Sequence, residues 1–252
     1  MIPFDITEAK DTGFFDCGTT QSGKSTLAKH QAEKLMDNGI NVYALDVSKV
    51  WTLDSPIDNI IEVPHDCATV DIPANQSAVI DLSHLGYVNR IKYVIQFCKA
   101  IYDWHMNKGF KRAPFEFVIF EEAHTYFFNG CFRSPKQFSP CIDLVTVGAN
   151  FNLRFGAITQ FPAMLDKALV KITQQRYFGW STEMNDLNYI RAFVGREYVN
   201  PKNPDSVFNL RKGQFLYQLR NNIAKIQSRP YVKKKADTFE LNGQQVQFAY
   251  IL

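Results

Sequence analysis

The sequence predicts an α/β fold with a doubly wound, mainly parallel sheet, because short apolar runs alternate with stretches of helical periodicity. Strands that alternate with helices imply parallel pairing. Hydrophobic residues make up 46% of the 252 residues and charged residues 21%, as in ordinary globular proteins. A chain of this length buries a full core, so disorder is expected only at the ends.

Five apolar runs have the length of buried strands. These runs are Phe14 to Cys17, Val42 to Leu45, Ala78 to Leu82, Phe115 to Phe120 and Phe155 to Thr159. A further strand is predicted around Arg176 to Trp180, and QFLYQL with AKIQSR are candidates for a two-stranded piece near the C-terminus.

Helical patterns separate most of these strands. The first predicted helix runs from Lys24 to Asn38 and stops at Gly39, which suits the left-handed position after a helix. Between Val88 and His105 apolar residues recur at three and four, which predicts a helix packed on one face. The remaining helices are expected over Ala163 to Ile172 and Met184 to Phe193.

The composition limits the classes of protein to which the chain can belong. A formal charge of +3 permits a polyanionic partner without arguing for one, so any DNA contact is expected to be local. Five scattered cysteines without a CxxC pair favour a reducing intracellular compartment. No window is long and apolar enough for a secretion signal or a membrane span, so a soluble protein is expected. Residues 1–230 are predicted to form one domain, and residues 231–252 a C-terminal tail or edge segment.

The sequence GTTQSGKS, from Gly18 to Ser25, fits the phosphate-loop pattern GxxxxGKS and lies between a predicted strand and a predicted helix. In such a loop the backbone amides and the helix N-terminus bind phosphate. Lys24 is expected to reach the β- and γ-phosphates, Ser25 to bind Mg²⁺, and Thr26 to contact the α-phosphate or cap the helix. The predicted nucleotide-binding residues are Gly18, Thr19, Thr20, Gln21, Ser22, Gly23, Lys24, Ser25 and Thr26.

Two carboxylates, Glu121 and Glu122, follow the apolar run Phe115 to Phe120. In phosphate-loop proteins such a strand lies beside the phosphate loop, so its last carboxylates face the metal and the attacking water. We expect Glu121 to support Mg²⁺ and Glu122 to act as the general base. The alternative is that the pair caps a following helix. His124 either senses the γ-phosphate or holds the loop.

Three segments, GTTQSGKS, FVIFEEAHTYF and NFNLRFGAITQFP, resemble the motifs of the HerA and FtsK superfamily of DNA-pumping ATPases. The resemblance covers roughly residues 10–230. It implies a P-loop NTPase of the RecA-like type with an additional strand and a catalytic glutamate, which binds ATP and Mg²⁺. It also implies that Gln160 is the polar sensor of the γ-phosphate, placed between the acidic and phosphate loops. The chain has no NKxD-type guanine motif, which also favours ATP.

The chain departs from this family in two ways. Family members commonly carry an arginine where this chain reads Gly148 to Asn150, so Arg154 and Arg176 are the candidates for an arginine finger. The phosphate loop starts at residue 18, which leaves no room before it for the N-terminal barrel of cellular HerA proteins. Minimal chains of this kind look most like the genome-packaging ATPases of viruses with internal membranes and of archaeal viruses.

The resemblance further implies a homo-oligomeric ring, usually a hexamer, with double-stranded DNA in its pore. Arg133 and Lys136 are candidates for DNA phosphate contacts, although any exposed loop can hold two basic residues. The leading expectation is a DNA translocase that packages a viral genome, docks on a capsid or membrane-vertex protein, and works in the host cytoplasm or virion. The alternatives are a HerA-like ATPase of cellular or plasmid DNA processing or conjugation, and a non-motor ATP-dependent switch or assembly factor.

Overall fold

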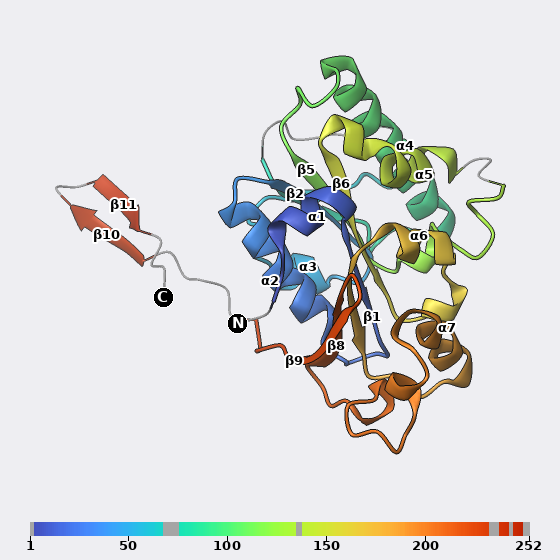
Figure 1. Ribbon diagram of the computed structural model, residues 1–252. Helices are drawn as coiled ribbons and strands as arrows, with labels where there is room; N and C mark the ends of the chain where they lie inside the picture. Colours follow the sequence, from blue (N-terminus) through green and yellow to red (C-terminus); the bar gives the residue numbers. More distant parts are fainter. Residues whose placement is uncertain (1–2, 68–75, 135–137, 232–236, 242–243, 249–252) are drawn as a thin grey trace.

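A single large sheet forms the centre of the protein in its computed structural model, and helices cover both of its faces (Figure 1). The structure describes residues 3–67, 76–134, 138–231, 237–241 and 244–248. The strands are β1 (Phe14–Cys17), β2 (Asn41–Asp46), β3 (Ile60–Glu62), β4 (Ala78–Asp81), β5 (Glu116–Phe120), β6 (Leu153–Thr159), β7 (Gln175–Gly179), β8 (Gln214–Leu219), β9 (Asn222–Gln227), β10 (Asp237–Leu241) and β11 (Gln244–Phe248).

The helices of the described residues lie mainly between successive strands, as the alternating pattern requires. They are α1 (Ile6–Thr12), α2 (Lys24–Asp37), α3 (Val50–Leu53), α4 (Tyr87–Lys108), α5 (Ser139–Thr146), α6 (Lys167–Ile172) and α7 (Met184–Val194), with short 3-10 turns η1 (Ala123–Thr125), η3 (Gly148–Phe151), η4 (Pro162–Met164), η5 (Glu197–Val199) and η6 (Val207–Asn209). None of the helices in the described ranges has both the length and the apolar character needed to cross a bilayer.

The strand order of the large sheet is β3-β4-β2-β5-β6-β1-β7-β8-β9. All neighbours from β3 to β7 in this order are parallel, whereas β8 and β9 add an antiparallel hairpin at the edge. This arrangement confirms the predicted α/β class and its mainly parallel sheet. The hairpin predicted from QFLYQL and AKIQSR is also present, and it extends the main sheet through β7.

β6 lies between β1 and β5 and is paired with both. β6, the strand that leads to Gln160, therefore separates the acidic strand β5 from β1, the strand of the phosphate loop. The register places Cys17 beside Thr159 and Phe120 beside Ala157, so the three strands end at the same edge of the sheet. The carboxyl edge of a parallel sheet is where ligands of α/β proteins bind.

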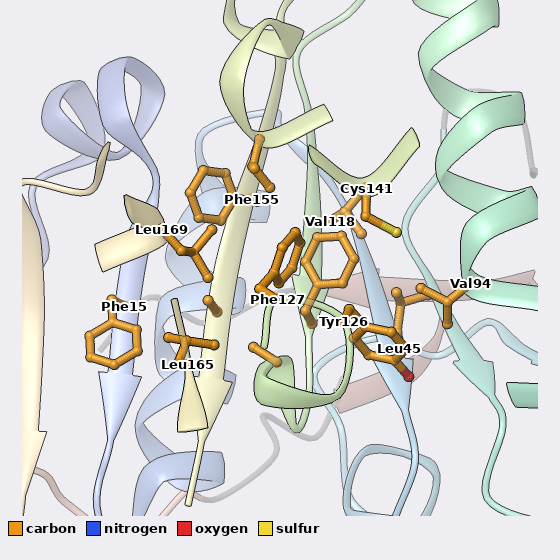
Figure 2. Packing of buried hydrophobic residues seen from close by; sticks show 14 of the residues in the cluster. Phe15, Leu45, Val94, Val118, Tyr126, Phe127, Cys141, Phe155, Leu165 and Leu169 are labelled. Carbon is orange, nitrogen blue, oxygen red and sulfur yellow. The ribbon is translucent and has the colours of Figure 1, made fainter. Parts of the chain in front are cut away.

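Two apolar clusters hold the helices on the sheet. One joins α1, α2 and α3 to one face, and the other joins α4, α5, α6 and α7 to the opposite face. Figure 2 shows part of the second cluster, in which Tyr126 and Phe127 lie between side chains of the strands and of α4. Each large apolar side chain buried in this way stabilises the fold by about 1.5–3 kcal/mol.

Gly156 gives the first cluster room for an aromatic stack. A Cβ atom at this position would lie 2.1 Å from Cζ of Phe14, so only glycine lets the Phe14 ring pack flat against β6. The same ring stacks on Phe117 of β5, with centroids 5.7 Å apart. Three adjacent strands are thereby fixed to one another on the side covered by α2.

Several elements differ from the sequence prediction. The helix expected from Ala163 begins only at Lys167, because Asp166 caps it and the turn η4 precedes it. The helices α1, α3 and α5 and the strand β3 were not predicted. β10 and β11 form a separate antiparallel pair within the predicted tail, and the domain boundary at residue 230 stays a prediction.

Candidate active site

The phosphate loop leaves the buried end of β1 at Cys17 and enters α2 at Lys24. Gly18 and Gly23 have φ angles of +147° and +102°, a region that side chains with a Cβ rarely adopt. A Cβ on Gly18 would also lie 2.9 Å from Oγ of Ser22. The two glycines of the motif are therefore required by the turn itself. Ser22 Oγ is buried and has no hydrogen-bond partner among the described residues, which suits contact with a bound phosphate.

Hydrogen bonds fix the loop to its neighbours. The amide of Thr19 donates to the carbonyl oxygen of Trp180, at the end of β7, at 2.9 Å. Lys24 is 7% exposed, and its Nζ donates to the carbonyl oxygen of Thr19 at 2.9 Å. Burial lowers the pKa of Lys24, while the nearby charge of Glu122 opposes that shift. The ammonium group therefore faces the acidic side of the site.

Glu121 directly follows β5, and its carboxylate is turned toward the end of β2. Its Oε2 accepts hydrogen bonds from the Val47 amide at 3.2 Å and from Ser48 Oγ at 2.9 Å. Burial, with the neighbouring charge of Asp46, raises the pKa of Glu121 to about 8. Without a cation, this carboxyl group is therefore largely protonated at neutral pH.

Glu122, the next residue, lies in a different environment. Its backbone is left-handed, with φ and ψ both 50°, a conformation that costs a non-glycine residue about 1–3 kcal/mol. Burial alone would raise the pKa of Glu122, but hydrogen bonds and charge from His124, with hydrogen bonds from Gln160, lower it below its usual value. Adjacent carboxyl groups with opposite pKa shifts are typical of acid–base sites, and the ionised Glu122 suits a general base.

Gln160 joins the phosphate loop to Glu122. Thr20 Oγ1 donates to Gln160 Oε1, and Gln160 Nε2 donates to Oε1 of Glu122. Gln160 directly follows β6, so the position of this strand between β1 and β5 makes the bridge. The family resemblance predicts that Gln160 lies between the two loops, but nothing in the sequence identifies Thr20 as its partner.

His124 completes the hydrogen-bonded group. Its Nδ1 lies 3.3 Å from Oε2 of Glu122 and 3.0 Å from Oγ1 of Thr159. The ring packs edge-on against Phe161, with centroids 5.3 Å apart. Of the two roles considered for His124, the structure favours holding the acidic loop, because its polar contacts are to that loop and to β6.

Two of the predicted catalytic residues lie elsewhere. Arg154 and Arg176 are each the second residue of their strands, at the end opposite the phosphate loop. Arg154 Nε donates to the Lys10 carbonyl oxygen at 2.6 Å. Arg176 is 8% exposed, and it donates to Val170 O and Gln218 Oε1 at 3.0 Å each. Neither arginine therefore lies at the site of its own chain. Each is at the opposite end of its strand, and its guanidinium group is hydrogen-bonded to other residues of the same chain.

The predicted DNA contacts have different outcomes. Arg133 is exposed in the turn that follows η1, as a phosphate contact requires. Lys136 lies outside the described residues. Both assignments stay predictions.

The oxygen ligands near the loop fit a magnesium ion. Ser25 in the first turn of α2 supplies a hydroxyl group, and Glu121 a carboxyl group that a nearby divalent cation would help to ionise. The described residues contain no cluster of three His, Cys, Asp or Glu side chains suited to a metal ion. Mg²⁺ needs none, because it commonly binds through one or two protein oxygens with substrate phosphates and water.

The fold and the loop geometry define the class: the chain has the fold of a P-loop nucleoside triphosphatase. No family model and no curated protein matches the chain. A similar solved structure is the genome packaging NTPase B204 of Sulfolobus turreted icosahedral virus 2 in complex with ATP-gammaS, with a TM-score of 0.61 and 17% identity over 88% of this chain and 99% of that one.

Two other solved structures share the fold. VirB4 of Thermoanaerobacter pseudethanolicus gives a TM-score of 0.63 and 10% identity, over 86% of this chain and 89% of that one. The pCW3 conjugation coupling protein TcpA, with ATPgS, gives 0.53 and 12%, over 87% of this chain and 61% of that one. At these identities the likeness concerns the fold.

Proposed function

We propose that this protein is an ATP-hydrolysing translocase of double-stranded DNA that packages a viral genome into a capsid. The hydrogen-bonded chain Thr20–Gln160–Glu122 carries the ATPase part of the proposal, because it connects the phosphate loop to the candidate base. The similarity of the fold to the genome packaging NTPase B204 supports the packaging part.

In this mechanism different residues bind the phosphates, activate the attacking water and orient the base. Lys24 neutralises charge on the β- and γ-phosphates, and the loop amides orient them. Glu122 accepts the proton of the attacking water, for which its lowered pKa keeps it ionised. Gln160 orients Glu122 and makes contact with the loop through Thr20.

Ser25 and Glu121 would hold Mg²⁺, Ser25 directly and Glu121 through a water molecule. The ion, when bound with ATP, would neutralise negative charge that develops on the phosphate oxygens. Ionisation of Glu121 in its presence would reverse the raised pKa of this group.

The motor would be a homo-oligomeric ring, a hexamer by the family resemblance, with duplex DNA in its pore. Arg133 is the described candidate for a sequence-independent phosphate contact. The arginine finger would come from a residue other than Arg154 and Arg176, because these two are held inside their own chain. A capsid or membrane-vertex protein would dock the ring, in the host cytoplasm or at the virion.

The test is steady-state ATP hydrolysis with and without long duplex DNA, for the wild type and for Glu122→Gln. Duplex DNA should stimulate the wild type, and the variant should lose at least about 100-fold in turnover, the usual contribution of general-base catalysis. Glu197→Gln, the same change at an exposed carboxylate, is the matched control and should behave like the wild type. Full activity of Glu122→Gln would remove Glu122 as the base.

A plasmid conjugation ATPase is the second candidate, favoured by the likeness of the fold to TcpA. Capsid genes beside the gene would support packaging, whereas relaxase or nuclease genes would support conjugation or DNA processing. Slow hydrolysis that ignores DNA would instead favour the non-motor switch.

A further inference from the structure

A cavity of about 390 Å³ opens where the phosphate loop enters α2. Gly23 and Thr26 line it on the side of the loop and of α2. The opposite wall comes from the two ends of the β8–β9 hairpin and the segment after it, and includes Lys212, Gln227, Arg229 and Tyr231.

The two walls of this cavity are hydrogen-bonded to each other. The Gly213 amide donates to the Ser22 carbonyl oxygen at 2.8 Å, and the Ser228 amide donates to the Gly213 carbonyl oxygen at 2.7 Å. Backbones approach closely here, because a Cβ on Gly23 would lie 3.2 Å from Cα of Gly213. The cavity therefore has a fixed position relative to the phosphate loop.

Contacts with α2 hold the outer part of the wall. His30 Nε2 lies 3.1 Å from the Arg229 carbonyl oxygen, and the His30 ring packs edge-on against Tyr231. The Lys29 ammonium group lies 5.8 Å from the centroid of the Tyr231 ring. The Tyr231 hydroxyl is buried yet has no hydrogen-bond partner among the described residues, which marks it as a group that a ligand can satisfy.

We propose that this cavity binds the nucleoside half of the nucleotide and selects adenine. The inference rests on the proposed function, since a triphosphate with its β- and γ-phosphates at Lys24 places its α-phosphate near Thr26. The nucleoside, which is esterified to the α-phosphate, then lies against Thr26, and Thr26 lines the cavity. Tyr231 and the Arg229 guanidinium supply flat groups for a base to pack on.

Gln227 is the residue that would make the cavity prefer adenine to guanine. Its Nε2 donates to the Ser228 carbonyl oxygen at 2.9 Å, so its amide oxygen is the atom left to accept a hydrogen bond from a ligand. Adenine presents an amino donor to such an acceptor, whereas guanine presents a carbonyl oxygen at the equivalent position. ATP should therefore bind more tightly than GTP, by about tenfold for one well-placed hydrogen bond.

The experiment measures the affinities of ATP, GTP and inorganic tripolyphosphate by calorimetry, in the Glu122→Gln background to limit turnover. Tripolyphosphate tests the phosphate loop without a nucleoside. Tyr231→Ala should weaken ATP binding by about tenfold and leave tripolyphosphate binding within about twofold. Gln227→Ala should reduce the preference for ATP over GTP. Lys225→Ala, on the same strand as Gln227 but paired with Asp205 outside the cavity, should change neither.

Each contrary result has one meaning. If ATP and tripolyphosphate bind equally well to the wild type, or if Tyr231→Ala and Gln227→Ala leave ATP and GTP binding unchanged, the nucleoside site is overturned and the phosphate loop is not. Tyr231→Ala is compared at equal folded content, checked by circular dichroism. An equal loss of both ligands in the folded variant also overturns the proposal, because Tyr231 would then act on the phosphate loop. If neither ATP nor tripolyphosphate binds, the proposed function itself fails.

Discussion

Asp16 is a buried carboxyl group two residues before the phosphate loop. It accepts a hydrogen bond from Gln31 of α2 at 3.2 Å, while its Oδ2 and the Gln31 amide oxygen are buried and have no hydrogen-bond partners among the described residues. Burial raises the pKa of Asp16 well above its usual value, although Gln31 and the charge of Lys24 oppose the shift. The folded protein therefore retains a proton on this residue at pH values where the unfolded chain has lost it.

We predict that Asp16→Asn stabilises the protein increasingly as the pH rises above about 4. In the wild type, the pKa of Asp16 is higher in the folded than in the unfolded state, so proton binding stabilises the folded protein. This stabilisation is complete below the unfolded value of 3.8 and is lost as the pH rises through the folded pKa. The slope for one group is at most about 1.4 kcal/mol per pH unit. Asparagine needs no proton and can donate to the Gln31 amide oxygen.

The measurement is the free energy of unfolding in urea at several pH values from 4 to 8. Asp11→Asn, at an exposed carboxylate, should keep the pH profile of the wild type. A constant difference between Asp16→Asn and the wild type across this range would show that Asp16 does not hold its proton in the folded state.

At the scale of residues, the motifs predicted the positions of Lys24, Glu122 and Gln160 around one edge of the sheet, while the roles of these residues stay predictions. Arg154 was chosen because it lies near the sensor strand and Arg176 because it lies on the next strand. Neither reason tells which end of a strand a residue occupies. The pKa shifts of Glu121 and Glu122 depend on Asp46, His124 and burial, which only the tertiary structure shows.

At the scale of elements, the strands with continuous apolar runs were predicted within about two residues because their burial on both faces leaves a strong signal. β3, with three residues and no buried side chain, carries no such signal. α1 was missed because only two of its seven residues are buried and one of these is Glu8. Its beginning is fixed by Asp5, whose side chain accepts a hydrogen bond from the Glu8 amide.

A buried hydrogen-bonded pair of side chains connects α4 to β5. His105 Nε2 lies 2.9 Å from Oε2 of Glu116, and His105 Nδ1 lies 2.6 Å from the Phe151 carbonyl oxygen. Both side chains are at most 2% exposed. Tyr43 donates to the other carboxylate oxygen of Glu116 at 3.1 Å. Glu116, the one polar residue of an otherwise apolar strand, is thus explained by a structural role.

We predict that His105→Ala lowers the free energy of unfolding by about 3–5 kcal/mol, because it removes a buried side chain and leaves the buried Oε2 of Glu116 without its hydrogen-bond partner. Chemical denaturation at neutral pH measures the loss. Lys99→Ala is the matched control on the same helix, since its pair with Asp103 is exposed and should contribute less than about 0.5 kcal/mol. A loss in His105→Ala as small as in this control would show that the contact between His105 and Glu116 contributes little to stability.

At the scale of the whole molecule, the candidate site is built from three strands and the loops that follow them. Neither candidate for the arginine finger lies in it, because Arg154 and Arg176 are hydrogen-bonded at the opposite ends of their strands. If the arginine comes from a neighbouring copy, the ATPase activity per subunit should increase with protein concentration as rings assemble. Parallel measurements of turnover and sedimentation velocity check this over a range that spans monomer and oligomer. Constant turnover across that range would mean that one chain is a complete enzyme.

The place of β6 between β1 and β5 has a mechanical consequence. β6 is paired in register with both strands, so a shift of the acidic strand relative to the strand of the phosphate loop would have to break at least one of these two ladders of backbone hydrogen bonds. The sheet therefore acts as a rigid spacer between the strand of the phosphate loop and the strand that precedes Glu122. If Glu122 is the base and Gln160 the sensor, rotation of their side chains can start and stop hydrolysis without a movement of the sheet, and such rotation is far faster than the closure of a domain.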